Sequence, residues 1–474
     1  MSLLKLSNFV DGKRSEPAAG AYAELVDPCT GQAWAQAPVS GPQAVDTAMR
    51  AAANAFEQWR RTTPSERQQA LLRIADALEA RAEEFSTVEA RDTGSTAAAG
   101  EVPLLVDQLR FFAGTARLLE GRSAGEYDGA HTSYVRREPV GVCAQLAPWN
   151  FPLLMTVLKS APAIAAGNTV VLKPARTTPG TALLFAEMAS EFLPAGVLNV
   201  VCGDPSTGRL MVEHPVPSLV SLTGSVPAGM DVARRAAATL KQVHLELGGK
   251  TPVVVCADAD LDAATAKIVE GAFCNAGQDC TAASRILVDR TIHDDLVERL
   301  VRAAQAVHLG PPSDPEAFYG PLNNAAQLER VSGVLERLPE HASVRTGGVR
   351  QGDEGYFFAP TVVSGVRQDD EIVHTEVFGP VLTVQPFDTE DEAVRLANDL
   401  EYGLAGAVWT TDHTRAMRLT GRLDCGTVWV NTHLGFPSEM PHGGFKRSGN
   451  GNDLSVYGFE TYTRIKHVMH HVGG

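Results

Sequence analysis

Apolar residues recur at helical spacing near the start of the chain and fall into short runs farther along it. Residues 43–61 and 66–90 have the periodicity of amphipathic helices, and Pro64-Ser65 is a helix start signal. From residue 140, apolar runs that indicate buried strands alternate with helix-length segments, which predicts an α/β fold with a doubly wound parallel sheet. The runs lie at 140–146, 169–172, 198–202, 218–222 and 242–246, and the helical segments at 154–166, 179–192, 206–213 and 226–239.

A second series of elements follows and predicts a second α/β domain. Its strands are expected at 252–256, 284–288, 361–363, 381–385 and 427–431, with a helix at 291–307. The segments 310–324 and 346–360 are rich in Gly and Pro, which is typical of loops. Because no repeat or low-complexity linker interrupts the chain, we expect the domains to share an extensive interface.

Composition narrows the range of functions. The 474 residues are 44% hydrophobic and 20% charged, as in soluble proteins of two or three domains. A net charge of −15 argues against a nucleic-acid partner, because such binding needs clustered Lys and Arg. No stretch reaches the roughly 18–20 apolar residues of a membrane span, and “MSLLKLSNFVDGKR” lacks the features of a signal peptide. We therefore expect a cytoplasmic protein without a membrane partner.

The seven cysteines are odd in number, widely spaced and without a CxxC pair, so we expect reduced thiols and no metal site. Cys143, Cys202 and Cys256 lie in apolar runs and are expected to be buried. Cys280 instead lies among small and polar residues in “CNAGQDCTAASR”. This context sets Cys280 apart from the buried cysteines but does not by itself show that it is a nucleophile.

Phosphate-binding motifs are weak in this chain. There is no GxGxxG fingerprint, and “GGKT” at 248–251 is not a Walker A loop because His244 stands where the first glycine would be. In “SLVSLTGSVPAGMDVA” a strand runs through Gly224 and Ser225 into a helix with Gly229 in its first turn. This segment is either a diphosphate-binding helix start or a structural strand-to-helix turn.

Two further segments supply groups that a cysteine nucleophile needs. “PWNFP” places Asn150, a neutral hydrogen-bond donor, after the first strand of the sheet, where open α/β sheets bind ligands. “HLELGGKTP” places Glu246 in an apolar run after the fifth strand, where lost hydration raises a carboxyl pKa toward that of a general base. The alternative for Glu246 is a salt bridge at a strand end.

Taken together, these segments resemble the aldehyde dehydrogenase superfamily over nearly the whole chain. The matching segments are “FVDGKR”, “APWNFPLLM”, “PAIAAGNTVVLKPA”, “LPAGVLNVVCG”, “LTGSVPAG”, “LELGGKTPVVV”, “NAGQDC”, “GYFFAPTVV”, “EVFGPVL”, “YGLAGAVWT”, “VWVNTH” and “PHGGFKRSGNG”. The resemblance implies a homodimer or homotetramer. It also implies a cofactor-binding domain (1–119 and 140–248), a catalytic domain (249–450) and a small β oligomerisation element (120–139 and 451–474).

The resemblance also implies the catalytic roles. Cys280 would attack the aldehyde carbon, and the Asn150 side chain with the Cys280 backbone N–H would hold the oxyanion. Hydride transfer to NAD would leave a thioester, which water would hydrolyse with Glu246 as general base. Lys159 is a further candidate catalytic residue.

The expected cofactor is NAD, with NADP as an alternative. Lys173 matches a ribose contact of the family, but three residues later Arg176 stands where many NAD-using members have a carboxylate. A guanidinium cannot accept from ribose hydroxyls and could pair with a 2′-phosphate, or it could point to solvent. The other expected cofactor contacts are Trp149, Gly224, Ser225, Gly229, Leu247, Gly248, Glu376 and Phe378.

The C-terminal half is most similar to the aminoaldehyde branch, which oxidises 4-aminobutanal from putrescine breakdown. The expected substrate pocket consists of Glu101, Phe151, Met155, Leu158, Asp279, Thr281, Trp409 and His442. Leu158 replaces a tryptophan of many relatives, so a bulkier substrate is an alternative, as are betaine aldehyde, a semialdehyde and an aromatic aldehyde. Asp453 occupies the place of a proton-relaying glutamate but is one methylene shorter. A cofactor-independent cysteine esterase is the competing class of enzyme, and a crystallin-like structural protein is the non-enzymatic alternative.

Overall fold

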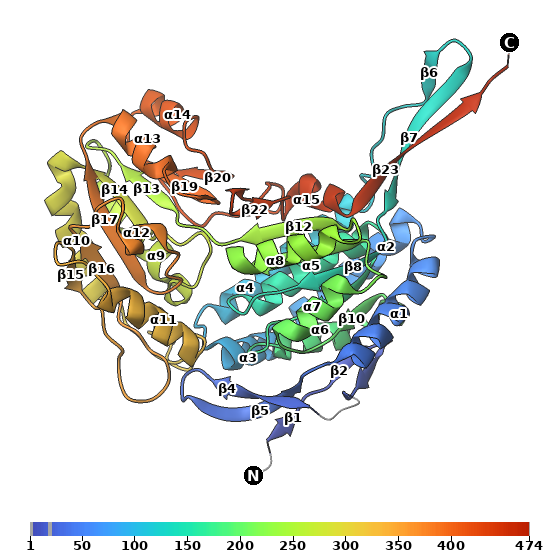
Figure 1. Ribbon diagram of the computed structural model, residues 1–474, viewed down its shortest axis with the longest axis horizontal. Coiled ribbons are helices and arrows are strands. Elements are labelled where there is room, and N and C mark those ends of the chain that lie inside the picture. Colours follow the sequence, from blue (N-terminus) through green and yellow to red (C-terminus); the bar gives the residue numbers. More distant parts are fainter. Residues whose placement is uncertain (1–2, 18–20, 474) are drawn as a thin grey trace.

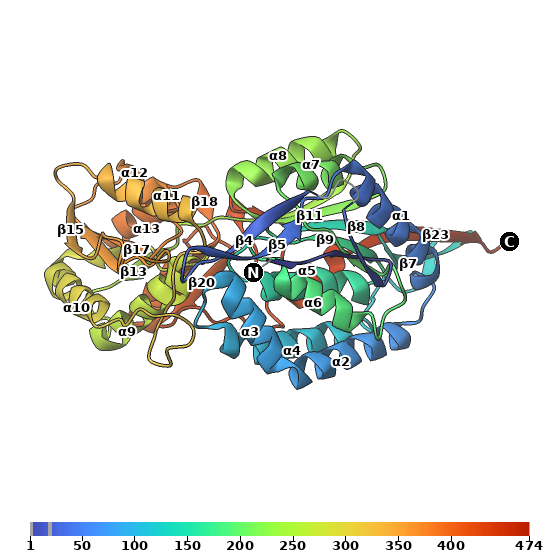
Figure 2. The same cartoon turned by 90° about the horizontal axis from the view of Figure 1, so that it is seen from below.

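The computed structural model describes residues 3–17 and 21–473. Within these ranges the chain forms two large sheets that lie side by side between layers of helices, and a narrow arm that extends from one end (Figure 1, Figure 2). This architecture confirms the predicted fold class: a doubly wound sheet, a second α/β unit and a small β element. No helix of the described ranges is long and apolar enough to cross a membrane.

The first sheet has five parallel strands at its centre, in the order β12, β11, β8, β9, β10. Its edges are antiparallel: β22 pairs with β12 at one end, and β2 and β3 continue from β10 at the other. The strands are β2 (Asn8–Val10), β3 (Lys13–Ser15), β8 (Val142–Leu146), β9 (Thr169–Lys173), β10 (Leu198–Val200), β11 (Leu219–Gly224), β12 (Gln242–Leu247) and β22 (Gly449–Asn450).

Helices cover both faces of this sheet, which explains why its strands are continuous apolar runs. Every residue of β8 and β9 is buried. Figure 2 shows α1, α7 and α8 on one side of the sheet and α2 to α6 on the other. The helices are α1 (Pro42–Trp59), α2 (Pro64–Ala80), α3 (Ala82–Thr93), α4 (Ala98–Thr115), α5 (Pro152–Ala165), α6 (Gly180–Ala189), α7 (Pro205–Glu213) and α8 (Val226–Ala237).

The strand order reverses between two neighbours at the centre of the first sheet. The chain runs outward from β8 through β9 to β10 and then returns to β11 on the other side of β8. The connections that leave β8 and β11 therefore diverge to opposite sides and open a crevice beyond the carboxyl ends of these strands. Open α/β sheets bind ligands at such a switch point.

The second sheet is parallel except for its edge strand β15, with α9 and α10 packed on one face and α13 and α14 on the other. Its strands are β13 (Pro252–Val255), β14 (Arg285–Asp289), β15 (Ser343–Thr346), β16 (Thr361–Ser364), β17 (Val381–Phe387), β19 (Ala405–Trp409) and β20 (Thr427–Val430). The helices of this unit are α9 (Leu261–Phe273), α10 (His293–Gln305), α11 (Ala325–Glu336), α12 (Glu371–His374), α13 (Glu390–Asn398) and α14 (His413–Thr420).

The arm is a three-stranded sheet of β6 (Gly125–Asp128), β7 (His131–Pro139) and β23 (Thr463–His471). The helix α15 (Ser455–Thr461) comes directly before β23 in the chain. It stands away from the two sheets, and β23 ends near its tip (Figure 1). Two small sheets complete the fold, one of β1 (Leu4–Lys5), β5 (Gln32–Pro38) and β4 (Tyr22–Asp27) and one of β18 (Tyr402–Gly403) and β21 (Phe445–Lys446).

One expected helix is divided in the structure. The segment 66–90 forms the two helices α2 and α3, and the chain turns between them at Arg81, whose φ of −110° and ψ of 21° are not helical. The Arg81 guanidinium pairs with Glu84 at 2.8 Å and lies over the ring of Phe85. No glycine or proline marks this break. The helical spacing of apolar residues therefore continues across it, and the sequence predicts one helix where the structure has two.

Candidate active site

A cavity of about 260 Å³ lies at the switch point of the first sheet. Residues at the carboxyl ends of β8, β11 and β12 line one side of it, including Asn150, Ser225 and Glu246. The loop that carries Cys280 and the segment of Glu376 line another. The three residues expected to perform the chemistry, Cys280, Asn150 and Glu246, thus line one cavity.

The loop before Cys280 has an unusual backbone. Asn275, Ala276 and Gly277 have φ values of 50°, 56° and 67°, in the left-handed region that costs an ordinary residue about 1–2 kcal/mol. A side chain at Gly277 would meet the Gly379 carbonyl oxygen at 2.2 Å, so close packing holds this shape. The Cys280 side chain is partly exposed to the cavity.

The environment of Cys280 disfavours the thiolate form of its side chain. Burial raises its pKa well above the usual range, and the nearby carboxyl groups of Asp279, Glu376 and Glu246 raise it further. Because only a thiolate is a strong nucleophile, the thiol must lose its proton to a neighbouring group or to water as it attacks.

Asn150 is fixed to the cysteine loop from both ends. Its side-chain Nδ2 donates to the Gln278 carbonyl at 3.0 Å, and the Asn275 side chain donates to the Asn150 carbonyl at 3.0 Å. An amide nitrogen carries two hydrogens, so Nδ2 retains one donor after the bond to Gln278. That donor is available to an oxygen held near Cys280.

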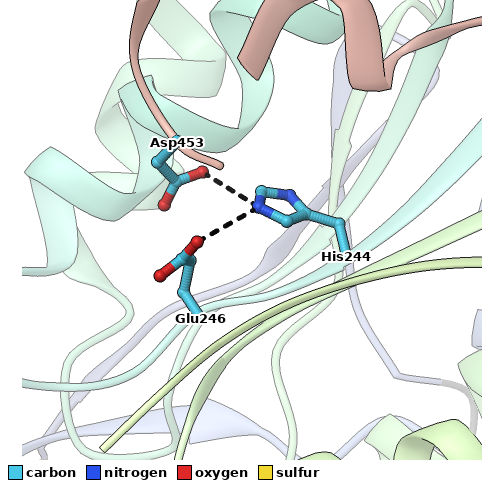
Figure 3. A group of neighbouring side chains, drawn as sticks. All are labelled: His244, Glu246 and Asp453. Carbon is cyan, nitrogen blue, oxygen red and sulfur yellow. Dashed lines mark ion pairs between the residues drawn. The ribbon is translucent and has the colours of Figure 1, made fainter. Parts of the chain in front are cut away.

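Glu246 is buried in a cluster with His244 and Asp453 (Figure 3). His244 Nε2 lies 3.6 Å from a Glu246 carboxylate oxygen and 3.7 Å from an Asp453 carboxylate oxygen. Burial and the Asp453 charge raise the pKa of Glu246 well above its usual value, whereas burial lowers that of His244 to about 4. Sequence reasoning did not include His244, although side chains two apart on a strand face the same side.

The loop of β22 brings Asp453 to this cluster. β22 pairs with β12, and the backbones of Asp453 and His442 then exchange hydrogen bonds of 2.9 and 2.7 Å. Lys159 Nζ donates to Ser221 Oγ at 3.0 Å, and that hydroxyl lies 3.4 Å from His244 Nδ1. Burial lowers the Lys159 pKa, while Asp453 and Glu246 oppose that shift.

Most of the expected cofactor contacts line the cavity. Glu376 accepts from the Gly249 backbone N–H at 3.0 Å, and the Phe378 ring meets Trp149 edge-on with ring centres 5.3 Å apart. Ser225 caps α8 without a side-chain bond, which leaves the N–H groups of Val226 and Ala228 available, while Pro227 has none. The buried Thr223 hydroxyl has no partner among the described residues. Trp149, Gly224, Ser225, Leu247, Gly248, Glu376 and Phe378 all line the cavity.

These features fit a dinucleotide. A helix start with available N–H groups binds diphosphate, and the orphaned Thr223 hydroxyl offers a further polar contact. Gly229 lies beneath Leu247, and a side chain there would meet the leucine methyl at 2.5 Å. Lys173 and Arg176 lie beyond the cavity lining, where Lys173 Nζ donates to two backbone carbonyls and Arg176 is exposed.

The expected substrate residues divide into two groups. Phe151, Met155, Leu158, Asp279, Thr281 and His442 line the cavity. Asp279 is held in place by Thr281, whose backbone N–H and hydroxyl both donate to it at 2.7 Å. The cavity wall also contains residues that sequence reasoning missed: Leu104, Gln108, Leu154, Phe436 and Leu454.

Glu101 and Trp409 lie elsewhere. Trp409 ends β19 and is 2% exposed in the core of the second sheet, where its large ring is covered on all sides. Glu101 lies one turn before Leu104 on α4, and one of its carboxylate oxygens is buried without a partner in the described ranges. Burial and the charge of Glu89 raise the Glu101 pKa well above its usual value. Neither side chain lines the cavity.

Comparison with known proteins decides the family. Residues 15–468 match the aldehyde dehydrogenase family. The chain belongs to the aldehyde dehydrogenase family. Enzymes of this family act on aldehydes, and the resemblance seen in the motifs is thereby confirmed.

Solved aldehyde dehydrogenases share the fold over its whole length. A mutant betaine aldehyde dehydrogenase from Staphylococcus aureus, in complex with NAD+, is 33% identical with a TM-score of 0.97, covering 99% of this chain and 98% of that one. A mutant aldehyde dehydrogenase from Bacillus cereus is 36% identical with a TM-score of 0.96, covering 99% and 97%.

Proposed function

We propose that this aldehyde dehydrogenase oxidises an aldehyde to its carboxylic acid through a thioester on Cys280, with NAD as cofactor and NADP as an alternative. The observation that carries the proposal is the meeting of Cys280, Asn150 and Glu246 in one cavity with a free helix start. A bound nicotinamide supplies the hydride acceptor. We further propose that the first sheet belongs to the cofactor-binding unit and the second to the catalytic unit.

The chain's own groups divide the chemistry between two steps. The Cys280 sulfur attacks the aldehyde carbon, and the resulting oxyanion accepts from Asn150 Nδ2 and the Cys280 backbone N–H. Loss of hydride from that carbon leaves a thioester. Glu246, whose raised pKa suits a general base, then takes a proton from water as the water attacks the thioester.

Arg176 is the proposed source of NADP use. It is exposed three residues after β9, close in sequence to Lys173. A charge-assisted hydrogen bond contributes about 1.5–3 kcal/mol, so we expect Arg176→Ala to lower kcat/KM for NADP about 10–100-fold and to leave that for NAD unchanged. Steady-state kinetics with both cofactors measure this. An equal loss with NAD and NADP would contradict the role, and Arg302→Ala, on the exposed face of α10, is the control.

For the substrate we propose an ω-aminoaldehyde such as 4-aminobutanal. Asp279, adjacent to the nucleophile, supplies a negative charge at the cavity wall, and the rings of Phe151 and Phe436 supply faces that attract a cation. The same groups suit the quaternary ammonium of betaine aldehyde, and one structural relative is a betaine aldehyde dehydrogenase. A cationic aldehyde is the class that both share.

A panel of aldehydes tests this class. We expect higher kcat/KM for 4-aminobutanal, 3-aminopropanal and betaine aldehyde than for succinic semialdehyde and phenylacetaldehyde, measured as cofactor reduction. Asp279→Asn is expected to lower kcat/KM about 10-fold for the cationic aldehydes only. The substitution removes the attraction between the carboxylate and the substrate's positive charge, which contributes about 1.4 kcal/mol. Asp369→Asn, at an exposed position just before α12 and outside the cavity lining, is the control. An equal loss of kcat/KM for all aldehydes in the Asp279→Asn enzyme would contradict recognition of the substrate's charge. Hydrolysis of esters without cofactor-dependent oxidation of any aldehyde would instead favour a cysteine esterase.

We also propose that the chain forms a homodimer or homotetramer through its arm. Ile465 and Met469 on β23 are 67% and 49% exposed, and Tyr127 on β6 is 59% exposed. Apolar side chains on a projecting sheet are typical of an interface. Light scattering should give a mass that is two or four times 50.4 kDa, and Ile465→Asp should lower it. A wild-type mass of one chain at micromolar concentration would reject this proposal.

A further inference from the structure

Three metal-ligating atoms converge at the back of the cavity: His244 Nε2, a Glu246 oxygen and an Asp453 oxygen (Figure 3). They lie within 4.8 Å of one another, on side chains from residues that are 1%, 4% and 5% exposed. His244 and Glu246 come from the same face of β12, and Asp453 from the loop after β22. Three different positions of the fold are thus aimed at one point.

Two of these three side chains lack hydrogen-bond partners at the point of convergence. His244 Nε2 and both Glu246 carboxylate oxygens are buried and make no hydrogen bond with any described residue. The nearby ammonium of Lys159 donates instead to Ser221. Burial of a histidine nitrogen and two carboxylate oxygens without a hydrogen-bond partner is unfavourable, and a bound cation would satisfy all three atoms.

The spacing of the atoms distinguishes between occupants. Zinc bonds of about 2.0–2.2 Å hold two tetrahedral ligands roughly 3.3–3.6 Å apart, whereas a water at about 2.8 Å from each would hold them roughly 4.5 Å apart. The two separations from His244 Nε2, 3.6 and 3.7 Å, match the ion better, and the two carboxylate oxygens lie within 4.8 Å of each other. Imidazole nitrogen and carboxylate oxygen are both among the ligands that zinc takes in proteins.

The surroundings of His244 favour the same occupant. Its other ring nitrogen, Nδ1, lies 3.4 Å from Ser221 Oγ, so a proton on Nδ1 would leave Nε2 free to bind a metal. Gly451 packs on the ring, where a side chain would meet Cδ2 at 2.4 Å, and holds it in this orientation. Glu246 and Asp453 line the cavity, which gives an ion a route of entry.

We propose that His244, Glu246 and Asp453 bind a zinc ion that inhibits the enzyme. The inhibitory part rests on the proposed function of Glu246 as the base that hydrolyses the thioester. An ion that holds the Glu246 oxygens prevents them from taking a proton from water. Hydride transfer from the thiohemiacetal does not use those oxygens and continues until every Cys280 carries an acyl group.

Direct binding tests the site apart from activity. The Cys280→Ala protein, which lacks the cavity thiol, is titrated with Zn2+ against a chromogenic chelator and with Co2+ for its visible spectrum. We expect one tight site per chain, with the bands of tetrahedral Co2+ and no thiolate charge-transfer band. Asp453→Asn and His244→Gln in this background should each weaken zinc binding at least about tenfold.

A matched control distinguishes this site from surface ligands. Asp314 and His308 form an exposed pair at 2.7 Å, and Asp314→Asn should leave the tight site unchanged. Lys159→Met should tighten zinc binding by removing a competing positive charge, a gain that misfolding could not produce. Equal binding by the Asp453→Asn and Asp314→Asn proteins, or a thiolate band with Co2+, would overturn the proposal.

Inhibition is measured on the wild-type enzyme. Zn2+ should suppress steady-state turnover but leave a burst of one reduced cofactor per site, and a chelator should restore turnover. If the Glu246→Gln enzyme keeps its burst, zinc that abolishes the burst of the wild-type enzyme acts on the thiol and counts against this site. An enzyme that oxidises no aldehyde yet binds zinc through Asp453 would overturn the proposed function alone, whereas an active enzyme without the tight site would overturn only this inference.

Discussion

Replacing Cys280 with alanine is expected to abolish aldehyde-dependent cofactor reduction, with kcat lowered by about 10⁴-fold or more. Among the described residues that line the cavity, Cys280 carries the one thiol, so no neighbour can form the covalent bond in its place. Cofactor affinity should not change, because the expected cofactor contacts lie on other segments. Stopped-flow absorbance of the reduced cofactor, together with a binding titration, measures both quantities.

Cys274 is the matched control for this experiment. It begins the same loop, lies outside the cavity lining, and burial raises its thiol pKa to about 12. Cys274→Ala should therefore retain activity. Comparable losses in the two variants would show that the loop, rather than the Cys280 sulfur, is what the reaction requires.

The second large effect is expected for Glu246→Gln, which should lower steady-state turnover by about 10²–10⁴-fold. Glutamine keeps the shape of the side chain but cannot take a proton from water, so the thioester accumulates. The first turnover should still release one reduced cofactor per site. Rapid mixing with aldehyde and cofactor measures the burst, and mass spectrometry detects the acylated Cys280.

Glu270→Gln is the control, because Glu270 pairs with Lys267 on the surface of α9. It should leave both burst and turnover unchanged. If Glu246→Gln loses the burst along with turnover, the carboxylate is needed to deprotonate Cys280. Glu246 would then act before hydride transfer, and hydrolysis of the thioester would not be its only role. The raised pKa of the Cys280 thiol makes this a meaningful alternative.

The parallel strands were predictable because burial on both faces turns them into continuous apolar runs, as in 169–173. β19, with the sequence AGAVW, was not assigned as a strand because its small residues dilute the apolar signal. The break at Arg81 left no trace in the pattern. It depends on a side chain that covers Phe85 and pairs with Glu84, which are tertiary details.

The candidate site was predictable where motifs mark strand ends. Asn150 and Glu246 follow strands of one sheet, so the fold alone brings them near each other. Trp409 and Glu101 were expected in the pocket but lie outside its lining, because the direction of a side chain depends on packing that spacing does not encode. The cluster of His244 with Asp453 was missed for a related reason, since over 200 residues separate its members and no metal-binding spacing links them.

The arm has a consequence for how the protein is made. Lys466 on β23 bonds to Glu138 beside it, across 328 residues of sequence. At about 5–20 residues per second, a ribosome needs roughly 15–65 s to synthesise that interval. Throughout this time β7 has an open edge, ready to pair with any strand it meets. β23 closes that edge, so the arm is completed only after residues 463–471 have left the ribosome.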